Sequence, residues 1–199
     1  MRKHLSVLAL AARGTVWRVL TVTLLAAVLS GALLWLVPAQ EPGAAIVAPD
    51  GTETPQYELV DFCKLPGRTG AAIACAAGFA ALLAVLSLNG CGYGAKTGCT
   101  VQRLRVGEGS LCLWWTLHYA VCVLFYWAVM AAVFTAVVKL RIDAWTPPPS
   151  CGYTVGGQTL LLTVYGGKFL HHLLPLRDAT VWVENLLLTA LCAAAAAQF

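Results

Sequence analysis

The sequence predicts an all-α polytopic membrane protein built on a four-helix transmembrane bundle, and three observations support this. Of its 199 residues, 59% are hydrophobic and 11% are charged, whereas about a quarter of the residues in soluble domains are charged. The mean hydropathy is +0.75. Long windows without Asp, Glu, Lys or Arg recur, and the basic residues behind the net charge of +4 lie mostly at segment ends. This distribution argues against nucleic-acid binding and makes the lipid bilayer the expected partner.

The first predicted span is Val16–Val37, which supplies the ~20 apolar residues that cross a hydrocarbon core of ~30 Å. Trp17 and Trp35 stand near its ends, roughly 27 Å apart at 1.5 Å per residue, as two aromatic belts require. The preceding Met1–Arg18 carries basic residues and no acid. We expect a signal anchor with its N-terminus inside, and the alternatives are a mitochondrial presequence or a cleaved signal peptide.

The second predicted span, Thr69–Leu88, is rich in small residues. Gly70, Ala74 and Gly78 follow one another at intervals of four, so they share one helix face. Small residues at this spacing let two helix backbones approach closely, which gains packing energy where lipid supplies no hydrophobic drive. We predict that these three residues form a helix-packing face, against the alternative that the span is simply alanine-rich.

The third predicted span, Leu111–Val138, is longer than the bilayer requires, so we expect it to tilt or to project. A tryptophan pair stands near its first end, where aromatic residues are typical of a membrane interface. Its more central aromatic residues, Phe125, Tyr126 and Trp127, are predicted to pack against other helices.

Two segments compete for the fourth span, Gly152–Leu174 and Ala179–Ala197. The first contains two glycine pairs and ends near basic residues and histidines, whereas the second is more apolar but contains Glu184 and Asn185. If Gly152–Leu174 crosses, its basic end falls inside, as the positive-inside bias prefers. We therefore predict it as the fourth span, and expect Ala179–Ala197 to be a C-terminal helix that either crosses as a fifth span or lies in the interface.

Charge placement also assigns the loops of what we expect to be a single membrane domain, 1–199. Pro38–Arg68 carries five acids against two basic residues and is predicted outside. Asn89–Ser110 carries three basic residues and one acid and is predicted inside, as the positive-inside bias requires. Lys139–Cys151 is then the second outside loop.

The eight cysteines divide by predicted compartment. Cys63 and Cys151 are those of the outside loops, and a disulfide joins them if the outside is oxidising and their Cα atoms come within ~7 Å. Two free thiols are the alternative. Cys91 and Cys99 lie in the inner loop, and their spacing lacks the second ligand pair that structural zinc requires. The cysteines of the apolar runs are expected to behave as small buried hydrophobes: Cys75, Cys112, Cys122 and Cys192.

A histidine in a membrane span calls for a functional hypothesis. His118 lies in the third predicted span, and His171 and His172 close the fourth, so they are candidate haem ligands. A core histidine and two interfacial ones are the simpler interpretation. Glu184 marks a proton or ion path if Ala179–Ala197 crosses. We predict no catalytic residue, no metal site and no cofactor, and hence no enzyme.

Three features of the chain belong together. They are CKLPGRTGAAIACAAGFAALLAVLSL from Cys63, Trp127–Met130, and Cys151 before a final span that opens with Tyr153 and Gly156 and ends in Leu173–Pro175. With these features, the stretch from Cys63 to Leu176 resembles the amastins, four-span surface proteins of trypanosomatid parasites. The family's Trp-Gly pair in the first outside loop has no counterpart here. The resemblance implies a plasma-membrane protein of the cell surface without known catalytic residues.

Three functions follow as hypotheses. The first is a non-enzymatic, amastin-like surface protein that acts through helix packing and its outside loops. The second is an accessory structural subunit of a mitochondrial inner-membrane complex, which the acid-free N-terminus favours. The third is a haem- or ion-handling membrane protein. In the first two, we expect protein partners or a homo-oligomer within the membrane.

Overall fold

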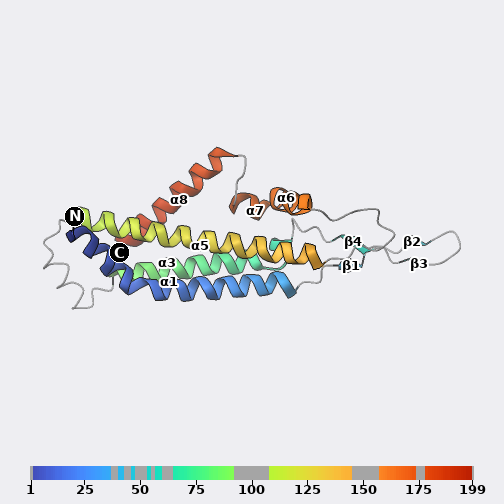
Figure 1. The fold of residues 1–199 in the computed structure, drawn as a ribbon, viewed down its shortest axis with the longest axis horizontal. Helices are drawn as coiled ribbons and strands as arrows, with labels where there is room; N and C mark the ends of the chain where they lie inside the picture. Colours follow the sequence, from blue (N-terminus) through green and yellow to red (C-terminus); the bar gives the residue numbers. More distant parts are fainter. Residues whose placement is uncertain are drawn as a thin grey trace. The chain divides into compact units, whose positions relative to one another are not determined.

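The computed structural model of the chain describes residues 2–36, 40–42, 46–47, 53–54, 57–59, 65–91, 108–144, 157–173 and 178–198. Helices dominate this part of the chain (Figure 1), as the predicted all-α class requires. The helices are α1 (Arg2–Leu36), α2 (Leu65–Arg68), α3 (Ala71–Cys91), α5 (Glu108–Ala144), α6 (Gly157–Gly166), α7 (Lys168–Leu173) and α8 (Ala179–Gln198).

Four helices are long and apolar enough to cross a membrane within the ranges that the structure describes. The first three candidate spans agree with the prediction, because each is a long run of apolar residues that satisfies its own backbone hydrogen bonds. The candidate spans are Ala11–Leu36 in α1, Ala71–Leu88 in α3, Gly109–Ala144 in α5 and Ala179–Ala197 in α8.

The fourth span corrects our prediction. Gly152–Leu174 does not form one long helix, because its described part divides at Gly167 into α6 and α7, of 10 and 6 residues. Two adjacent glycines weaken a helix and permit a bend, and the described part of this segment is not among the helices long and apolar enough to cross a membrane. The alternative segment, Ala179–Ala197, holds the fourth candidate span instead.

The second predicted outside loop begins later than predicted. α5 continues without interruption to Ala144, so the charged residues Lys139, Arg141 and Asp143 belong to the helix rather than to a loop that begins at residue 139. The helix has 37 residues, or about 55 Å at 1.5 Å per residue. It is therefore long enough to project beyond the hydrocarbon, as its sequence length suggested.

The first predicted outside loop contains strands that the sequence analysis did not anticipate. β1 (Gln40–Pro42) pairs with β4 (Tyr57–Leu59), and β2 (Ile46–Val47) pairs with β3 (Glu53–Thr54), both antiparallel. The second pair lies between the first in sequence, so the loop folds as nested hairpin strands. Short strands of two or three residues give little periodicity for a sequence to reveal.

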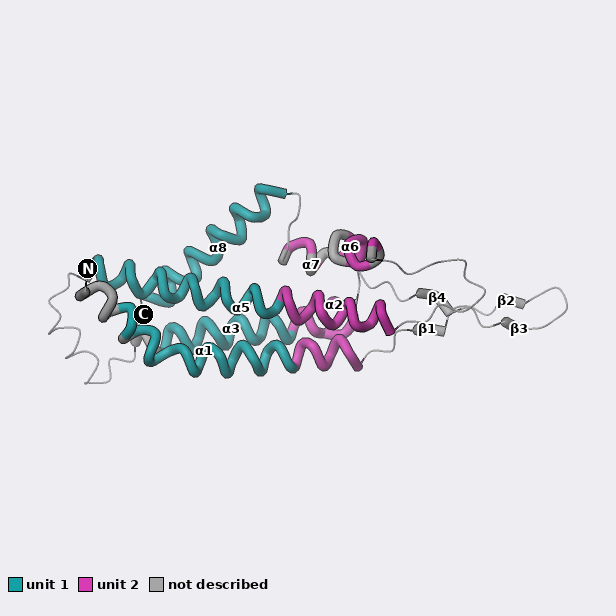
Figure 2. Tube along the Cα trace, in the orientation of Figure 1, with its two compact units in different colours: residues 1–28, 74–130, 177–199 teal, residues 29–73, 131–176 magenta. Residues whose placement is uncertain are grey.

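The chain divides into two compact units (Figure 2), and the contacts described below lie within one or the other. Unit 1 contains residues 1–28, 74–130 and 177–199, so it assembles parts of α1, α3 and α5 with α8 as four helices. Unit 2 contains residues 29–73 and 131–176, which include the ends of α1 and α5, the strands, α2, α6 and α7.

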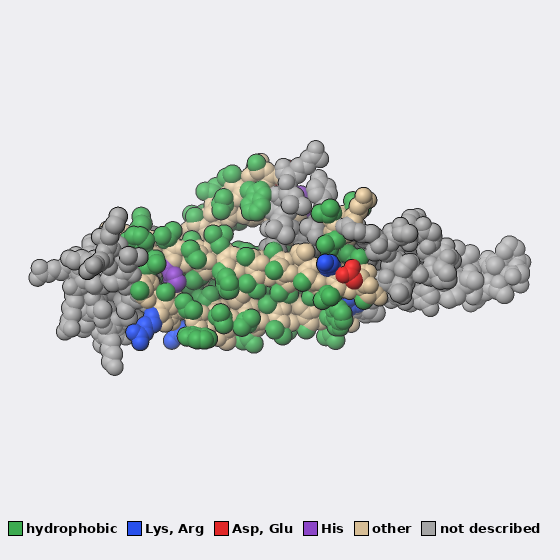
Figure 3. Space-filling view, viewed as in Figure 1, with side chains coloured by type: hydrophobic (Ala, Val, Ile, Leu, Met, Phe, Trp, Pro, Cys, Tyr) green, Lys and Arg blue, Asp and Glu red, His purple; other side chains and the backbone are tan. Residues whose placement is uncertain are grey.

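Hydrophobic side chains cover the outer surface of the helices on the face shown in Figure 3. Trp17 is 76% exposed and Trp35 is 52% exposed, so both face outward near the two ends of the first candidate span. Outward Trp at both ends of an apolar helix is typical of contact with the two membrane interfaces. The surface thus suits lipid rather than water.

We predict that cysteines introduced as Arg13→Cys and His172→Cys react with a membrane-impermeant thiol reagent from opposite faces of the membrane. Both native side chains are exposed. Arg13 lies near the start of the candidate span in α1, so nearly all of that span and the spans in α3 and α5 lie between the two positions, and an odd number of crossings reverses the side. The parent chain gives the background labelling. Labelling of both positions from the same face would restore Gly152–Leu174 as a crossing.

Candidate functional site

In unit 1, α3 turns one face of small and apolar residues toward the neighbouring helices. Cys75, Leu82 and Leu86 on this face are buried. Gly78 marks the closest approach, because a Cβ added there would lie 2.5 Å from the Cβ of Ala26 on α1. The same added atom would lie 2.7 Å from the hydroxyl oxygen of Tyr126 on α5. Only glycine lets the three helices meet at this point.

Two buried tyrosines of α5 hold α3 through its backbone. The Tyr126 hydroxyl donates to the carbonyl oxygen of Cys75 at 2.6 Å, and the Tyr119 hydroxyl donates to that of Leu86 at 2.9 Å. A carbonyl oxygen has a second lone pair beyond its helical bond, so each bond satisfies a buried phenol without breaking the helix. The Phe79 ring lies 5.0 Å from the Trp127 ring between centroids, which adds an aromatic contact.

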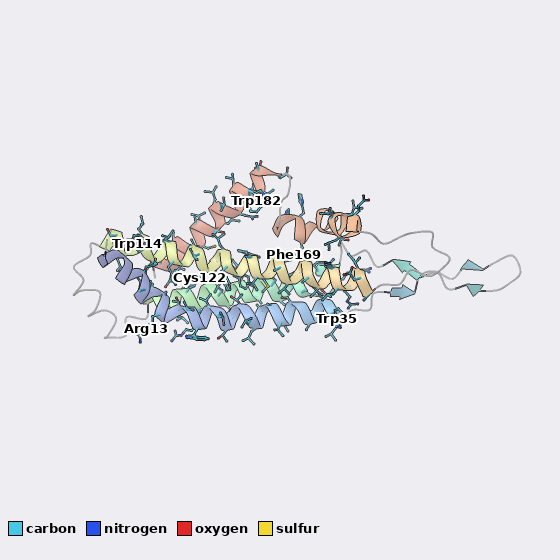
Figure 4. The ribbon with its side chains drawn as sticks, in the orientation of Figure 1. Arg13, Trp35, Trp114, Cys122, Phe169 and Trp182 are labelled. Carbon is cyan, nitrogen blue, oxygen red and sulfur yellow. The ribbon has the colours of Figure 1, made fainter. Side chains whose placement is uncertain are left out.

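His118 joins α5 to α1. The Thr15 hydroxyl donates its one proton to the carbonyl oxygen of Ala11 at 2.8 Å, and its oxygen lies 2.7 Å from His118 Nε2. We therefore assign the proton of His118 to Nε2, which donates to Thr15. The Cys122 sulfur lies 3.7 Å from the same nitrogen, and Figure 4 labels Cys122 on α5. The histidine is thus a bond between helices.

The predicted packing face on α3 is partly wrong. Gly70 precedes the helix and has φ of +71°, and nothing lies within 4 Å of a Cβ added to it. Its left-handed backbone makes the turn from α2 into α3, a conformation that glycine adopts without steric cost. Ala74 is half-buried, and Gly78 is where the helices meet. Because α3 begins only after Gly70, the packing face follows Cys75 and Gly78 instead.

In unit 2, Arg141 caps the end of α1. Its Nη2 donates to the carbonyl oxygen of Leu34 at 3.1 Å and to that of Trp35, and its guanidinium lies 5.1 Å from the Trp35 ring centroid. The last carbonyls of a helix lack intrahelical partners and carry partial negative charge. The buried guanidinium donates hydrogen bonds to these carbonyl oxygens and places a positive charge beside their partial negative charge. Figure 4 labels Trp35 at the end of α1.

The two short helices of unit 2 pack against α5. The ring of Phe169 on α7 lies 4.9 Å from that of Phe134 on α5, between centroids. Leu160 on α6 packs against the buried Val138 and Ile142 of α5. These contacts give the predicted fourth span a different role, as a pair of helices that cover one end of α5.

The candidate haem ligands divide between the two units. His118 belongs to unit 1 and is bonded to Thr15, whereas His171 and His172 belong to α7 of unit 2. His171 is half-buried and His172 is exposed. Within the described ranges, no group of three or more His, Cys, Asp or Glu side chains gathers as a metal site would require.

The remaining predicted residues have mixed outcomes. The proposed partners Cys63 and Cys151 lie outside the described residues, as does Cys99. Cys75 and Cys122 are buried free thiols, as expected, while two others are half-buried, Cys112 and Cys192. Of the central aromatic residues of α5, Tyr126 is buried and Trp127 packs on Phe79, but Phe125 is 45% exposed and faces outward.

Two features escaped the sequence analysis. The sequence analysis placed Arg141 in a loop. Its hydrogen bonds go to Leu34 and Trp35 of α1, which are far away in sequence, so no local pattern could reveal them. The buried face of α1 had a signal that spacing could have found, since its residues recur at intervals of three or four. They are Ala11, Thr15, Val19, Thr23, Ala26, Ala27, Ser30 and Leu34.

No family model matches the chain, and no curated protein or solved structure matches it either. The fold and the contacts therefore define its class by themselves. The protein is an all-α, multi-pass membrane protein, and the described part of the chain contains four helices apolar and long enough to cross a membrane. Its polar interior side chains His118, Tyr119, Tyr126 and Arg141 bond neighbouring helices.

Replacing Gly78→Val is expected to destabilise the protein by about 1–3 kcal/mol, the usual cost of overpacking a close contact. The added side chain must displace Ala26 and the Tyr126 hydroxyl. Ala76→Val on the exposed face of α3 is the matched control and should change stability little. The free energy of unfolding in a mixed-micelle SDS titration measures both; equal effects would contradict the close approach.

Replacing Arg141→Leu is expected to lower the free energy of unfolding by about 1.5–3 kcal/mol, the range for a hydrogen bond made by a charged group. Arg141→Lys should recover part of this loss, because it keeps the charge but not the planar fork. Lys139→Leu, an exposed residue of the same helix, should have little effect. Thermal unfolding in detergent distinguishes the three variants, and an Arg141→Leu protein as stable as Lys139→Leu would remove the capping role.

Proposed function

We propose that this is a non-enzymatic multi-pass membrane protein that acts by helix packing and by binding other proteins in the plane of the bilayer. One observation supports it above others: four polar side chains of α5 bond neighbouring helices. His118 bonds Thr15, and the tyrosine hydroxyls and Arg141 bond backbone carbonyl oxygens.

These bonds favour a structural role because of what catalysis requires. A general acid, base or metal ligand must present its reactive atom to a substrate or a cofactor. Here the Nε2 atom of His118 is already bonded to Thr15, and the Tyr126 hydroxyl lies against Gly78 and Cys75. Such groups hold helices together where lipid contributes no hydrophobic drive.

The setting of this function is proposed from the sequence. The amastin resemblance favours a surface protein of the plasma membrane, and its matches in the second and third spans fall on the long helices α3 and α5. Of its last part, Leu173 lies at the end of α7, and the other matched residues lie outside the described ones. The accessory subunit of a mitochondrial inner-membrane complex is the alternative, favoured by the acid-free start of α1.

N-terminal sequencing of the mature protein and imaging of a C-terminal tag distinguish the two settings. A surface protein with a signal anchor keeps its N-terminus, and its C-terminal tag is seen at the cell periphery. A processed N-terminus together with mitochondrial staining would replace the amastin-like proposal by the accessory-subunit alternative.

A histidine exchange tests the structural role directly. We expect His118→Gln to stay close to wild type in thermal unfolding, because an amide N–H can also donate to Thr15. His118→Leu should lose about 0.6 kcal/mol and at most about 1.7 kcal/mol, the mean and the maximum found for interhelical hydrogen bonds in membranes. The absorption spectrum of the gently extracted protein is the second readout. A Soret band that His118→Gln abolishes would contradict the proposal and favour haem binding.

A further inference from the structure

The first half of α1 carries an exposed basic patch, which we define as Arg13, Gly14, Trp17 and Arg18. All four residues are exposed, and Figure 4 labels Arg13 at this end of the helix. Residues 1–40 contain no Asp or Glu, so α1 itself places no negative charge beside the two arginines. A surface of this kind is complementary to an anion.

Trp17 indicates the depth of the basic patch in the bilayer. Its side chain is 76% exposed, and an outward Trp near the end of a span lies at the level of the lipid headgroups. Arg13 stands four residues earlier, about 6 Å nearer the start of the helix and on the same side. Arg18 follows Trp17, but helical side chains lean toward the N-terminus and long basic side chains extend toward the interface. Both guanidinium groups therefore reach the level of the lipid phosphates.

Gly14 leaves open space between the two arginines. Nothing lies within 4 Å of a Cβ added to it. Trp17 and Arg18 stand three and four residues further on, so they border this position from the next turn of the helix. A phosphate group can thus approach the backbone at Gly14 with an arginine on either side. Guanidinium groups suit this ligand, because their planar fork of N–H donors matches phosphate oxygens.

An exposed apolar track continues from the basic patch toward the middle of the candidate span. Leu24 is 53% exposed and Val28 is 69% exposed. At 100° per residue, these two residues fall within about 60° of Arg13 and Trp17 around the helix. One side of α1 thus presents a cation, an interfacial ring and apolar side chains in that order. A phospholipid presents its phosphate, glycerol and acyl chains in the same order with depth.

We infer that the basic patch binds the headgroup phosphate of an anionic phospholipid, whose acyl chain lies along Leu24 and Val28. A zwitterionic lipid suits the patch less well, because its headgroup brings a second positive charge beside the two arginines. A soluble phosphate compound satisfies the arginines but has no chain for the apolar track. The site belongs to α1 alone and adds a lipid partner to the proposed binding of proteins.

Native mass spectrometry of the detergent-purified full chain tests the site with two probes, dioleoylphosphatidylglycerol and dioleoylphosphatidylcholine. Wild type should bind the phosphatidylglycerol more tightly. Arg13→Gln should weaken phosphatidylglycerol binding about fivefold, the effect of one basic residue near a membrane surface. Lys139→Gln removes the same charge from an exposed position on α5 and should leave this binding unchanged. Equal weakening by both variants would overturn the site, because general charge attraction would then explain the binding.

Gly14→Leu tests the space for the phosphate while it keeps both arginines. The new side chain fills the open position, so phosphatidylglycerol binding should weaken at least as much as in Arg13→Gln. Gly109→Leu, at an equally open glycine of α5, is the matched control and should bind like wild type. Thermal unfolding should show both variants at least as stable as wild type, because no neighbour meets the new Cβ and leucine favours helix. Unchanged lipid binding by Gly14→Leu would overturn the inference.

Glycerol 3-phosphate distinguishes the lipid from its soluble headgroup. In large excess over phosphatidylglycerol, it should fail to displace the lipid from the wild-type chain, because it cannot occupy the apolar track. Displacement by glycerol 3-phosphate, or equal binding of phosphatidylglycerol and phosphatidylcholine, would overturn the assignment to an anionic lipid. Each of these failures leaves the proposed function in place, since that function rests on the bonds between helices.

Discussion

Hydrocarbon offers no hydrogen bonds, so a polar group inside the membrane is costly unless it finds a partner within protein. Many of the side chains that meet this requirement belong to α5. Its side chains His118, Tyr119, Tyr126 and Arg141 reach a threonine or backbone carbonyl oxygens of α1 and α3. Each bond satisfies a group that would otherwise be costly to bury, and at the same time fixes which helix lies beside which.

Glycine sets where the helices meet and where they end. At Gly78 the missing side chain lets α1 and α5 close on α3, and at Gly70 a left-handed backbone turns the chain into that helix. The pair Gly166 and Gly167 lies where α6 gives way to α7. The same residue therefore gives close packing in one place and a break between two short helices in another, because both depend on the absent Cβ.

The bonded polar residues in the spans support one view of the function. Interior groups such as Tyr126 and His118 are bonded to neighbouring helices within the chain and stabilise it. We interpret them as the contacts that hold the protein together in the bilayer.

The sequence by itself determined the solvent and three of the spans, because apolar length is a local property that needs no knowledge of neighbours. It did not determine the fourth span: charge bias favoured Gly152–Leu174, but the continuity of a helix depends on its glycines, and α8 is the long helix. Only the tertiary structure decided which face of α3 is buried and that Arg141 caps α1. Those outcomes depend on helix rotation and on residues more than a hundred positions apart, which no local pattern records.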